Sequence, residues 1–337
     1  MGKVSFEVEV PPPFRLDLTV WALRRRPHNT IDLWDGTTYQ RVLAVDSAPV
    51  LVSARQVRPN RPAPASTVLR VVVSRRGADP DEAEATEVRR ILEAMLGLGI
   101  DLSRFYKLTA RDERLANLAE RFRGLRPPRF ASVFEALVNA VACQQLSLTV
   151  GIHLLDRLAG AFGPEVKLRG APPGFPVPGQ LASTEPTDLR RLGFSRAKAS
   201  SIIEVARRVA SGDLDLEALA RTDEKTARTV LLSLPGIGRW SAEYVLLRGL
   251  GRLGTLPGDD VGARNSLRRY FELPGKVGYE EIASLARRWW PFGGIVYFHL
   301  LLEGLARDGH LSNSMTWREG SGQAPSATQR GERPATE

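Results

Sequence analysis

The stretch from Leu234 to Leu250 reads LPGIGRWSAEYVLLRGL, and it decides the fold. Its first five residues form a Pro-Gly-x-Gly turn that is too tight and too bare of side chains to be a core element. Apolar residues recur at helical spacing before the turn, at residues 223–232, and after it, at residues 239–250. The pattern therefore predicts two helices joined by a short, glycine-containing turn.

The predicted turn is a candidate anion site. Gly236 and Gly238 allow unusual backbone angles, and a helix that begins near Arg239 points its first amides out of the turn. Such an exposed helix N-terminus suits a DNA phosphate, and carbonyls of the hairpin can hold a monovalent cation that shares this phosphate. The alternative is an ordinary glycine-terminated turn between helices. The amphipathic run SAEYVLLRGLG after the turn favours the phosphate-binding hairpin.

A second stretch, Gly254 to Leu267, reads GTLPGDDVGARNSL and places two acids at a predicted helix start. One explanation is helix capping, a role that Asp259 can fill. The other is catalysis by Asp260, since breaking an N-glycosidic bond builds positive charge on the sugar. A fixed carboxylate stabilises that charge and can orient an attacking water. The spacing alone leaves both explanations open.

Together the two stretches resemble the helix-hairpin-helix and Gly/Pro-rich aspartate loop of a DNA glycosylase superfamily. Within it, the chain most resembles the DNA-3-methyladenine glycosylase II branch, with weaker similarity over residues 90–310. The resemblance implies an α+β fold, in which a mainly α-helical glycosylase core follows an N-terminal TBP-like antiparallel β-sheet domain. It also implies base excision repair, in which the enzyme flips and hydrolyses alkylated purines such as 3-methyladenine.

The resemblance assigns roles to individual side chains. Asp260 falls on the catalytic aspartate, and Trp240 falls where bifunctional members carry a Schiff-base lysine. An indole cannot be that nucleophile, so a monofunctional enzyme that uses water is implied. Trp240 and Tyr244 match base-pocket positions, where an aromatic face suits a cationic base, although core packing would also explain them. Gln145 matches the wedge that fills the gap left by the flipped nucleotide.

The resemblance also assigns backbone sites. DNA phosphate binding falls on four residues of the turn: Gly236, Ile237, Gly238 and Arg239. The carbonyls expected to hold Na⁺ or K⁺ belong to Leu232, Leu234 and Gly236. No other cofactor is expected, because the single Cys143 excludes an iron–sulfur cluster built on several cysteines, and the four histidines show no metal-ligand spacing.

Two departures from the family pattern concern substrate choice and DNA contacts. Leu301 stands where some members have a pocket tryptophan, so the base preference can differ. The arginine that usually follows the Trp-Pro-aromatic run is absent from residues 291–294.

The charge of the chain agrees with a nucleic-acid partner. The 337 residues carry a net charge of +9, which suits a polyanion such as double-stranded damaged DNA. The first residues lack the apolar core of a signal peptide, and no stretch is apolar enough to span a membrane. We therefore expect a cytoplasmic, nucleoid-associated monomer.

The patterning along the chain predicts three regions. Residues 1–100 form a β-rich domain, with strands near residues 4–10, 41–45, 50–57 and 68–74 and a closing helix at 81–98. Residues 101–310 form the helical domain, and residues 311–337 form a disordered tail. Helices are expected at residues 132–145, 148–162, 195–211, 213–220, 223–232, 239–250, 261–271, 279–289 and 295–306, with a loop at 170–179.

Three functions remain open from the sequence. The first is the monofunctional glycosylase for alkylated purines, and the second is a related glycosylase for oxidised or deaminated bases. The third is a non-enzymatic DNA-binding protein that uses the hairpin as a phosphate grip. A grip has no need of a carboxylate at Asp260, which favours the enzymes. Trp240 disfavours a glycosylase with lyase activity.

Overall fold

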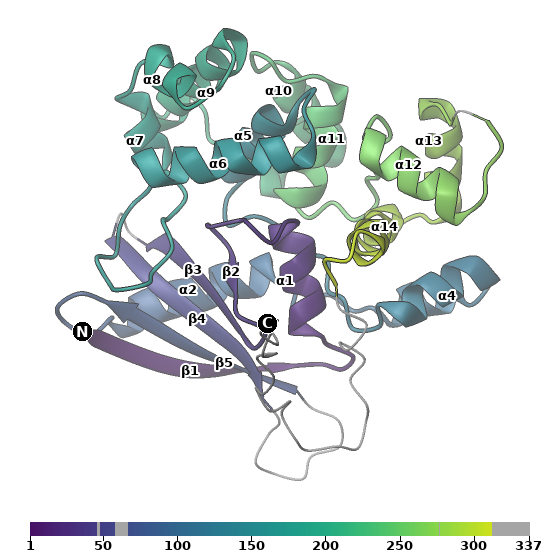
Figure 1. The fold of residues 1–337 in the computed structure, drawn as a ribbon, viewed down its shortest axis with the longest axis horizontal. Coiled ribbons are helices and arrows are strands. Elements are labelled where there is room, and N and C mark those ends of the chain that lie inside the picture. Colours follow the sequence, from purple (N-terminus) through teal and green to yellow (C-terminus); the bar gives the residue numbers. More distant parts are fainter. Residues whose placement is uncertain (46–47, 58–66, 276, 312–337) are drawn as a thin grey trace, which may run out of the picture.

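A computed structural model describes residues 1–45, 48–57, 67–275 and 277–311. Its N-terminal part contains an antiparallel sheet of five strands in the order β1-β5-β4-β3-β2, which confirms the predicted α+β fold. The strands are β1 (Gly2–Val10), β2 (Leu33–Trp34), β3 (Thr38–Val45), β4 (Ala48–Val57) and β5 (Thr67–Arg75). The remaining elements are helices, and most of them lie above the sheet in the view of Figure 1.

Alternating side chains explain the sheet and its register. Val8 pairs with Leu69, and Val52 pairs with Val73, so that their buried side chains share the core face. Helix α2 (Glu82–Met95) covers this face and packs against β1 and β3. It begins at a capping box, in which Asp81 and Glu84 satisfy each other's backbone amides.

One helix of the N-terminal part was not expected from the sequence. Helix α1 (Leu16–Arg24) follows β1 directly and packs against the last helix of the chain. Nearly all of its residues are buried, so its sequence shows no polar face, and Arg15 makes no side-chain cap. Both usual signals of a helix are therefore missing.

The helical part confirms most of the predicted helices. Those expected from the sequence are α5 (Val133–Cys143), α6 (Leu148–Phe162), α9 (Arg196–Ala210), α10 (Glu224–Leu232), α11 (Arg239–Arg248), α12 (Val261–Tyr270), α13 (Tyr279–Arg288) and α14 (Gly293–Arg307). Those not expected are the short α3 (Ser103–Thr109), α4 (Glu113–Arg121), α7 (Pro178–Ala182) and α8 (Pro186–Arg191).

The prediction of a helix at residues 213–220 was wrong. The chain there forms turns and then a single 3₁₀ helix, Glu217–Arg221. The reason is that Leu214, Leu216 and Leu219 anchor the segment at spacings of two and three residues, which suits a tight turn better than an α-helix.

The hydrophobic core does not follow the predicted domain boundary. One cluster joins Val71 of the sheet to Leu137 of α5, and the other joins Trp21 of α1 to Phe298 of α14. Buried Arg41 of β3 adds an ion pair to Glu135 of α5, at 2.6 Å. The sheet thus holds the helices in place, and the division at residue 100 stays a prediction.

Within the described residues, no helix is both long and apolar enough to cross a membrane. The disordered tail expected at residues 311–337 lies, from residue 312 onward, outside the described residues.

Candidate active site

The hairpin is present where the sequence predicts it. Leu234 and Ile237 are buried and anchor the turn, while Pro235 and Gly236 between them are exposed. Gly236 has a φ of 74°, and an added Cβ would lie 2.8 Å from Oγ of Ser201. Glycine is therefore required there by both backbone angle and space.

The N-terminus of α11 faces solvent without a side-chain cap. Gly238 is the N-cap, and no side chain accepts from the first amides of the helix among the described residues. The Arg239 side chain points elsewhere: its Nε donates to Asp259 at 2.6 Å, and it stacks on the ring of Tyr279. Any phosphate contact at Arg239 would therefore come from its backbone amide.

Asp260 is both a helix cap and a pocket carboxylate. Its Oδ1 accepts from the Ala263 amide at 2.8 Å and caps α12. Its Oδ2 accepts from Trp240 Nε1 at 3.2 Å and from the Tyr297 hydroxyl at 3.3 Å. The assignment of the cap to Asp259 was wrong, because Asp259 is held instead by ion pairs with Arg239 and Arg264. The cap therefore uses one oxygen of the carboxylate and leaves Oδ2 at the cavity, so the cap does not exclude the catalytic role, which stays a prediction.

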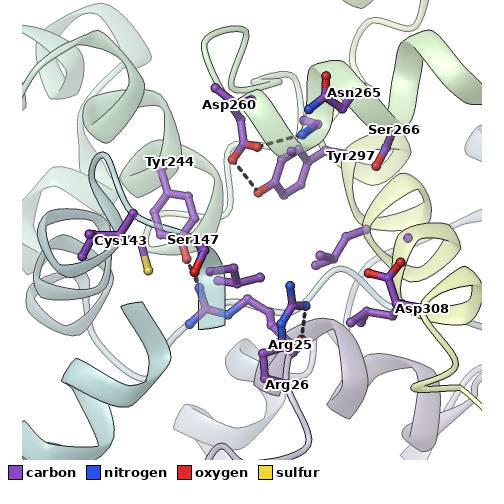
Figure 2. Close-up of a pocket in the computed structure, with 18 of the residues that line it drawn as sticks. Arg25, Arg26, Cys143, Ser147, Tyr244, Asp260, Asn265, Ser266, Tyr297 and Asp308 are labelled. Carbon is purple, nitrogen blue, oxygen red and sulfur yellow. Dashed lines mark hydrogen bonds between the residues drawn. The ribbon is translucent and has the colours of Figure 1, made fainter. Parts of the chain in front are cut away.

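Asp260 opens into a cavity of about 600 Å³ (Figure 2). Trp240 and Tyr244 line it one turn apart on α11, with ring centroids 5.4 Å apart. Trp240 is half-buried and packs against the hydrophobic core, and buried Tyr244 belongs to that core as well as to the cavity wall. The volume is within the range of small-molecule sites and suits one flipped base.

The predicted wedge lies at the mouth of this cavity. Gln145 is exposed and lines the cavity. Its φ of 54° is a left-handed conformation, so the residue does not continue the helix that precedes it. Its neighbour Gln144 is turned inward, where its amide donates to the Gly236 carbonyl at 2.8 Å and to Ser241. Gln144 therefore ties the wedge segment to the hairpin.

Of the predicted cation carbonyls, that of Leu232 belongs to the last residue of α10, and those of Leu234 and Gly236 lie in the hairpin turn. The Leu234 carbonyl already accepts from the Ile237 amide at 3.2 Å, and the Gly236 carbonyl accepts from Gln144. A carbonyl oxygen has two lone pairs, so each keeps one for a cation. The Na⁺ or K⁺ site stays a prediction.

Two arginines of the site were missed in the sequence. Arg25 and Arg26 directly follow α1 and line the cavity. Arg25 is buried, and its guanidinium donates to the Tyr244 hydroxyl and to Asn139, both at 2.7 Å. The run of three arginines after a Leu-rich segment could have indicated a helix C-terminus, but nothing in the sequence places it against residues 139–260.

Tyr297 was also missed. It lies on α14, one turn before Leu301, and both line the cavity. Burial and then the charge of Asp260 raise the pKa of Tyr297 well above its usual value, so its hydroxyl stays protonated and donates. The helical spacing from Leu301 is the signal that could have found it.

These features define a class of protein: a helix-hairpin-helix beside a base-sized cavity that contains a carboxylate. The family model described as "HhH-GPD superfamily base excision DNA repair protein" matches residues 138–292. The chain belongs to this superfamily, in its DNA-3-methyladenine glycosylase branch.

Individual relatives support this placement. A DNA-3-methyladenine glycosylase of Bacillus subtilis is 32% identical over 215 residues, which cover 64% of this chain and 71% of that protein. The structure of a 3-methyladenine DNA glycosylase from Archaeoglobus fulgidus is similar over 91% of this chain and all of that one, with a TM-score of 0.76 and 29% identity. A Schizosaccharomyces pombe 3-methyladenine DNA glycosylase in complex with abasic DNA has a TM-score of 0.50 at 26% identity, covering 58% and 92% of the two chains.

Proposed function

We propose that this protein is a monofunctional DNA glycosylase that removes alkylated purines, such as 3-methyladenine, from double-stranded damaged DNA. The observation that carries the proposal is the Oδ2 atom of Asp260, which lies at the cavity wall between two hydrogen-bond donors. The names of the relatives agree with this substrate class.

The geometry supports hydrolysis in which a carboxylate, a pocket and an anchor cooperate. The hairpin binds a phosphate of the damaged strand, and Gln145 fills the gap that the extruded nucleotide leaves. The base lies against Trp240 and Tyr244. Asp260 then stabilises the positive charge that develops on the sugar and orients the attacking water.

The choice of water as nucleophile follows from the absence of a suitable amine. No lysine is among the described residues that line the cavity. Lys198 lies against the end of α5, where its Nζ donates to the carbonyls of Ala142 and Gln144. An amine held in this way cannot attack a sugar carbon in the cavity.

We further propose that the enzyme acts as a monomer on nucleoid DNA in the cytoplasm. A Na⁺ or K⁺ ion held by the hairpin carbonyls would share the bound phosphate. The chemistry itself requires no metal and no iron–sulfur cluster, since the carboxylate and water supply every group that reacts.

The decisive experiment uses duplexes that each carry one defined lesion, with half of each sample treated with hot alkali. We expect strand breaks in 3-methyladenine-type duplexes only after alkali, because a monofunctional enzyme leaves an intact abasic site. Breaks without alkali, with borohydride trapping of enzyme on DNA, would contradict the monofunctional mechanism. DNA binding without excision of any lesion would favour the phosphate grip.

A second candidate substrate class is an oxidised or deaminated purine, and Arg25 favours it. The buried guanidinium of Arg25 forms no ion pair among the described residues, and it repels a cationic base while it attracts a base carbonyl. Relative rates on hypoxanthine or 8-oxoguanine duplexes and on 3-methyladenine duplexes decide between the classes. If Arg25 selects neutral bases, Arg25→Gln will shift the ratio of rates toward 3-methyladenine.

A further inference from the structure

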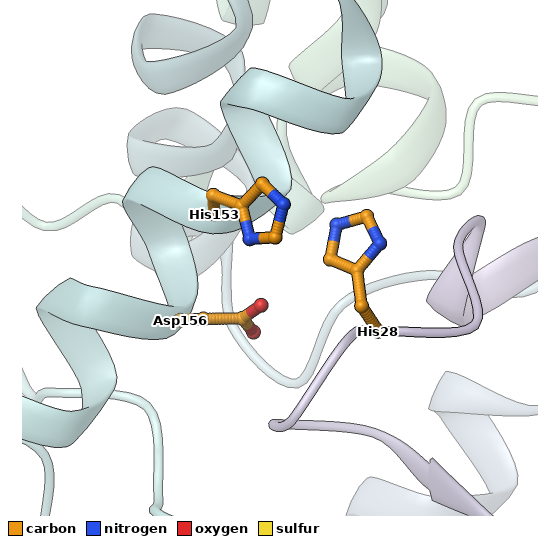
Figure 3. A group of neighbouring side chains, drawn as sticks. All are labelled: His28, His153 and Asp156. Carbon is orange, nitrogen blue, oxygen red and sulfur yellow. The ribbon is translucent and has the colours of Figure 1, made fainter.

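Two histidines and one aspartate, from two distant segments of the sequence, lie together on the structure (Figure 3). His28 belongs to the segment that follows α1, while His153 and Asp156 lie one turn apart on α6. The two imidazoles stack with centroids 4.0 Å apart, and one ligand atom from each of the three residues lies within 4.8 Å of the others.

The polar groups of this cluster are incompletely satisfied. The Nε2 atom of His28 is buried and has no hydrogen-bond partner among the described residues. Asp156 uses one oxygen, Oδ1, to accept from the amide and hydroxyl of Thr30 at 2.9 and 3.0 Å. No hydrogen bond or ion pair within the described residues joins this carboxylate to either imidazole. The cluster therefore offers lone pairs that the protein itself does not use.

The chemistry of the three side chains suits metal binding. An imidazole binds a metal through the lone pair of one ring nitrogen, and Oδ2 of Asp156 accepts no hydrogen bond among the described residues. A divalent cation between the three groups would bring positive charge to this carboxylate.

We propose that His28, His153 and Asp156 form a binding site for a divalent transition metal ion of the zinc type. Two imidazole nitrogens and one carboxylate oxygen are a donor set that zinc takes, with water as a fourth ligand. Zinc bonds of about 2.0–2.2 Å require donor atoms roughly 3–3.5 Å apart. The ligand atoms lie within 4.8 Å of one another, so the exposed side chain of His153 would turn out of its stack on His28 to bind the ion.

The metal would link the segment after α1 to helix α6, and these two elements are already in contact. The segment of His28 also contains Arg25 and Arg26, which line the cavity, and Arg26 Nε donates to Thr149 of α6 at 3.1 Å. A metal bond from His28 to α6 would add a stronger link to the hydrogen bonds that Arg26 and Thr30 already make across this junction. The ion therefore has a structural role outside the reacting groups, and it is separate from the monovalent cation proposed at the hairpin.

The test uses the untagged full chain, stripped with a chelator and then titrated with zinc. We expect one zinc ion per chain by calorimetry, a rise of several degrees in Tm, and visible absorption bands when cobalt(II) replaces zinc. His153→Ala removes an exposed ligand without disturbing the core, and it should weaken zinc binding at least tenfold. Asp156→Asn keeps an oxygen for Thr30 and should weaken it similarly. His310→Ala, at a histidine outside the cluster, should bind zinc as the unmodified protein does.

Two outcomes would overturn the proposal. One is the absence of saturable zinc binding by the unmodified chain at micromolar concentrations. The other is zinc binding by His153→Ala or Asp156→Asn that is as tight as in His310→Ala. Neither outcome bears on base excision, which is measured separately with lesion duplexes, so the two proposals can fail independently.

Discussion

At the scale of single residues, Asp260 caps a helix with one carboxylate oxygen and leaves the other for the catalytic role that we propose. One carboxylate oxygen caps α12, and this bond fixes the position of the other oxygen at the cavity wall. Because the cap already orders this side chain, the proposed contact with the sugar would need little further loss of side-chain entropy.

The substitution Asp260→Asn separates the helix cap from the proposed catalytic role. Asparagine caps helices as well as aspartate does, so the fold should remain intact, but the negative charge is lost. We expect excision to fall at least a hundredfold, since the charge that develops on the sugar is no longer stabilised. Single-turnover excision assays and DNA-binding titrations measure the two properties, and binding should persist.

The matched control is Asp112→Asn, which makes the same change at the N-cap of α4, far from the cavity. It should leave the excision rate within about twofold. Unchanged excision in Asp260→Asn would remove this residue from the mechanism.

Tyr297→Phe tests the hydroxyl that donates to Asp260. A hydrogen bond to a charged group contributes about 1.5 kcal/mol, so its loss should slow excision roughly tenfold while DNA affinity changes little. The control is Tyr270→Phe, which removes a hydroxyl bonded to the Arg114 carbonyl on the surface. Equal excision rates in the two variants would show that Tyr297 only packs.

At the scale of elements, the hairpin depends on one glycine. Gly236→Ala places a Cβ against Ser201 in a backbone conformation that costs alanine roughly 1–2 kcal/mol. The turn should deform, and affinity for undamaged duplex should fall several-fold, as fluorescence anisotropy would measure. Gly160→Ala on α6, whose added Cβ meets open space, should keep full affinity. Full affinity in Gly236→Ala would contradict the role of the turn.

Two of the elements that the sequence predicted closely have a clear polar and apolar side. Helices α6 and α10 show this pattern and end within one residue of their predicted bounds. Helix α1 escaped prediction because it is buried on nearly all sides, and the helix expected at residues 213–220 is replaced by turns that tertiary contacts favour.

At the scale of the whole molecule, burial of His299 makes stability depend on pH. Burial lowers the pKa of His299 to about 4, against roughly 6.5 in the unfolded chain. The unfolded chain takes up a proton below pH 6.5 while the folded chain stays neutral until near pH 4. The contribution of His299 is therefore complete above pH 6.5 and declines as the pH falls, by about 2 kcal/mol at pH 5.

His299→Leu isolates this effect. The variant loses the bond to the Ile295 carbonyl at every pH, but it no longer carries the titrating group. Denaturant unfolding at pH 7.5 and pH 5 should show that the variant loses about 2 kcal/mol less stability on acidification than the unmodified protein. An identical loss in both proteins would contradict a buried, neutral His299.

The cavity is also a property of the whole molecule, because distant segments build it. Its walls come from the segment after α1, the end of α5, and the helices α11, α12 and α14. Shared hydrophobic clusters hold these elements together, so the N-terminal part contributes to the site as well as to stability.

The sequence by itself determined the hairpin and the helix that follows it, and it placed two acids at the start of the next helix. Local patterns of glycine, proline and apolar spacing encode these features within about 30 residues. Only the tertiary structure decided that Asp260 caps α12, that Arg25 and Tyr297 reach the same cavity, and that His28 lies against His153. The physical reason is that such contacts depend on packing between elements, and no local spacing encodes the distance between residues 28 and 153.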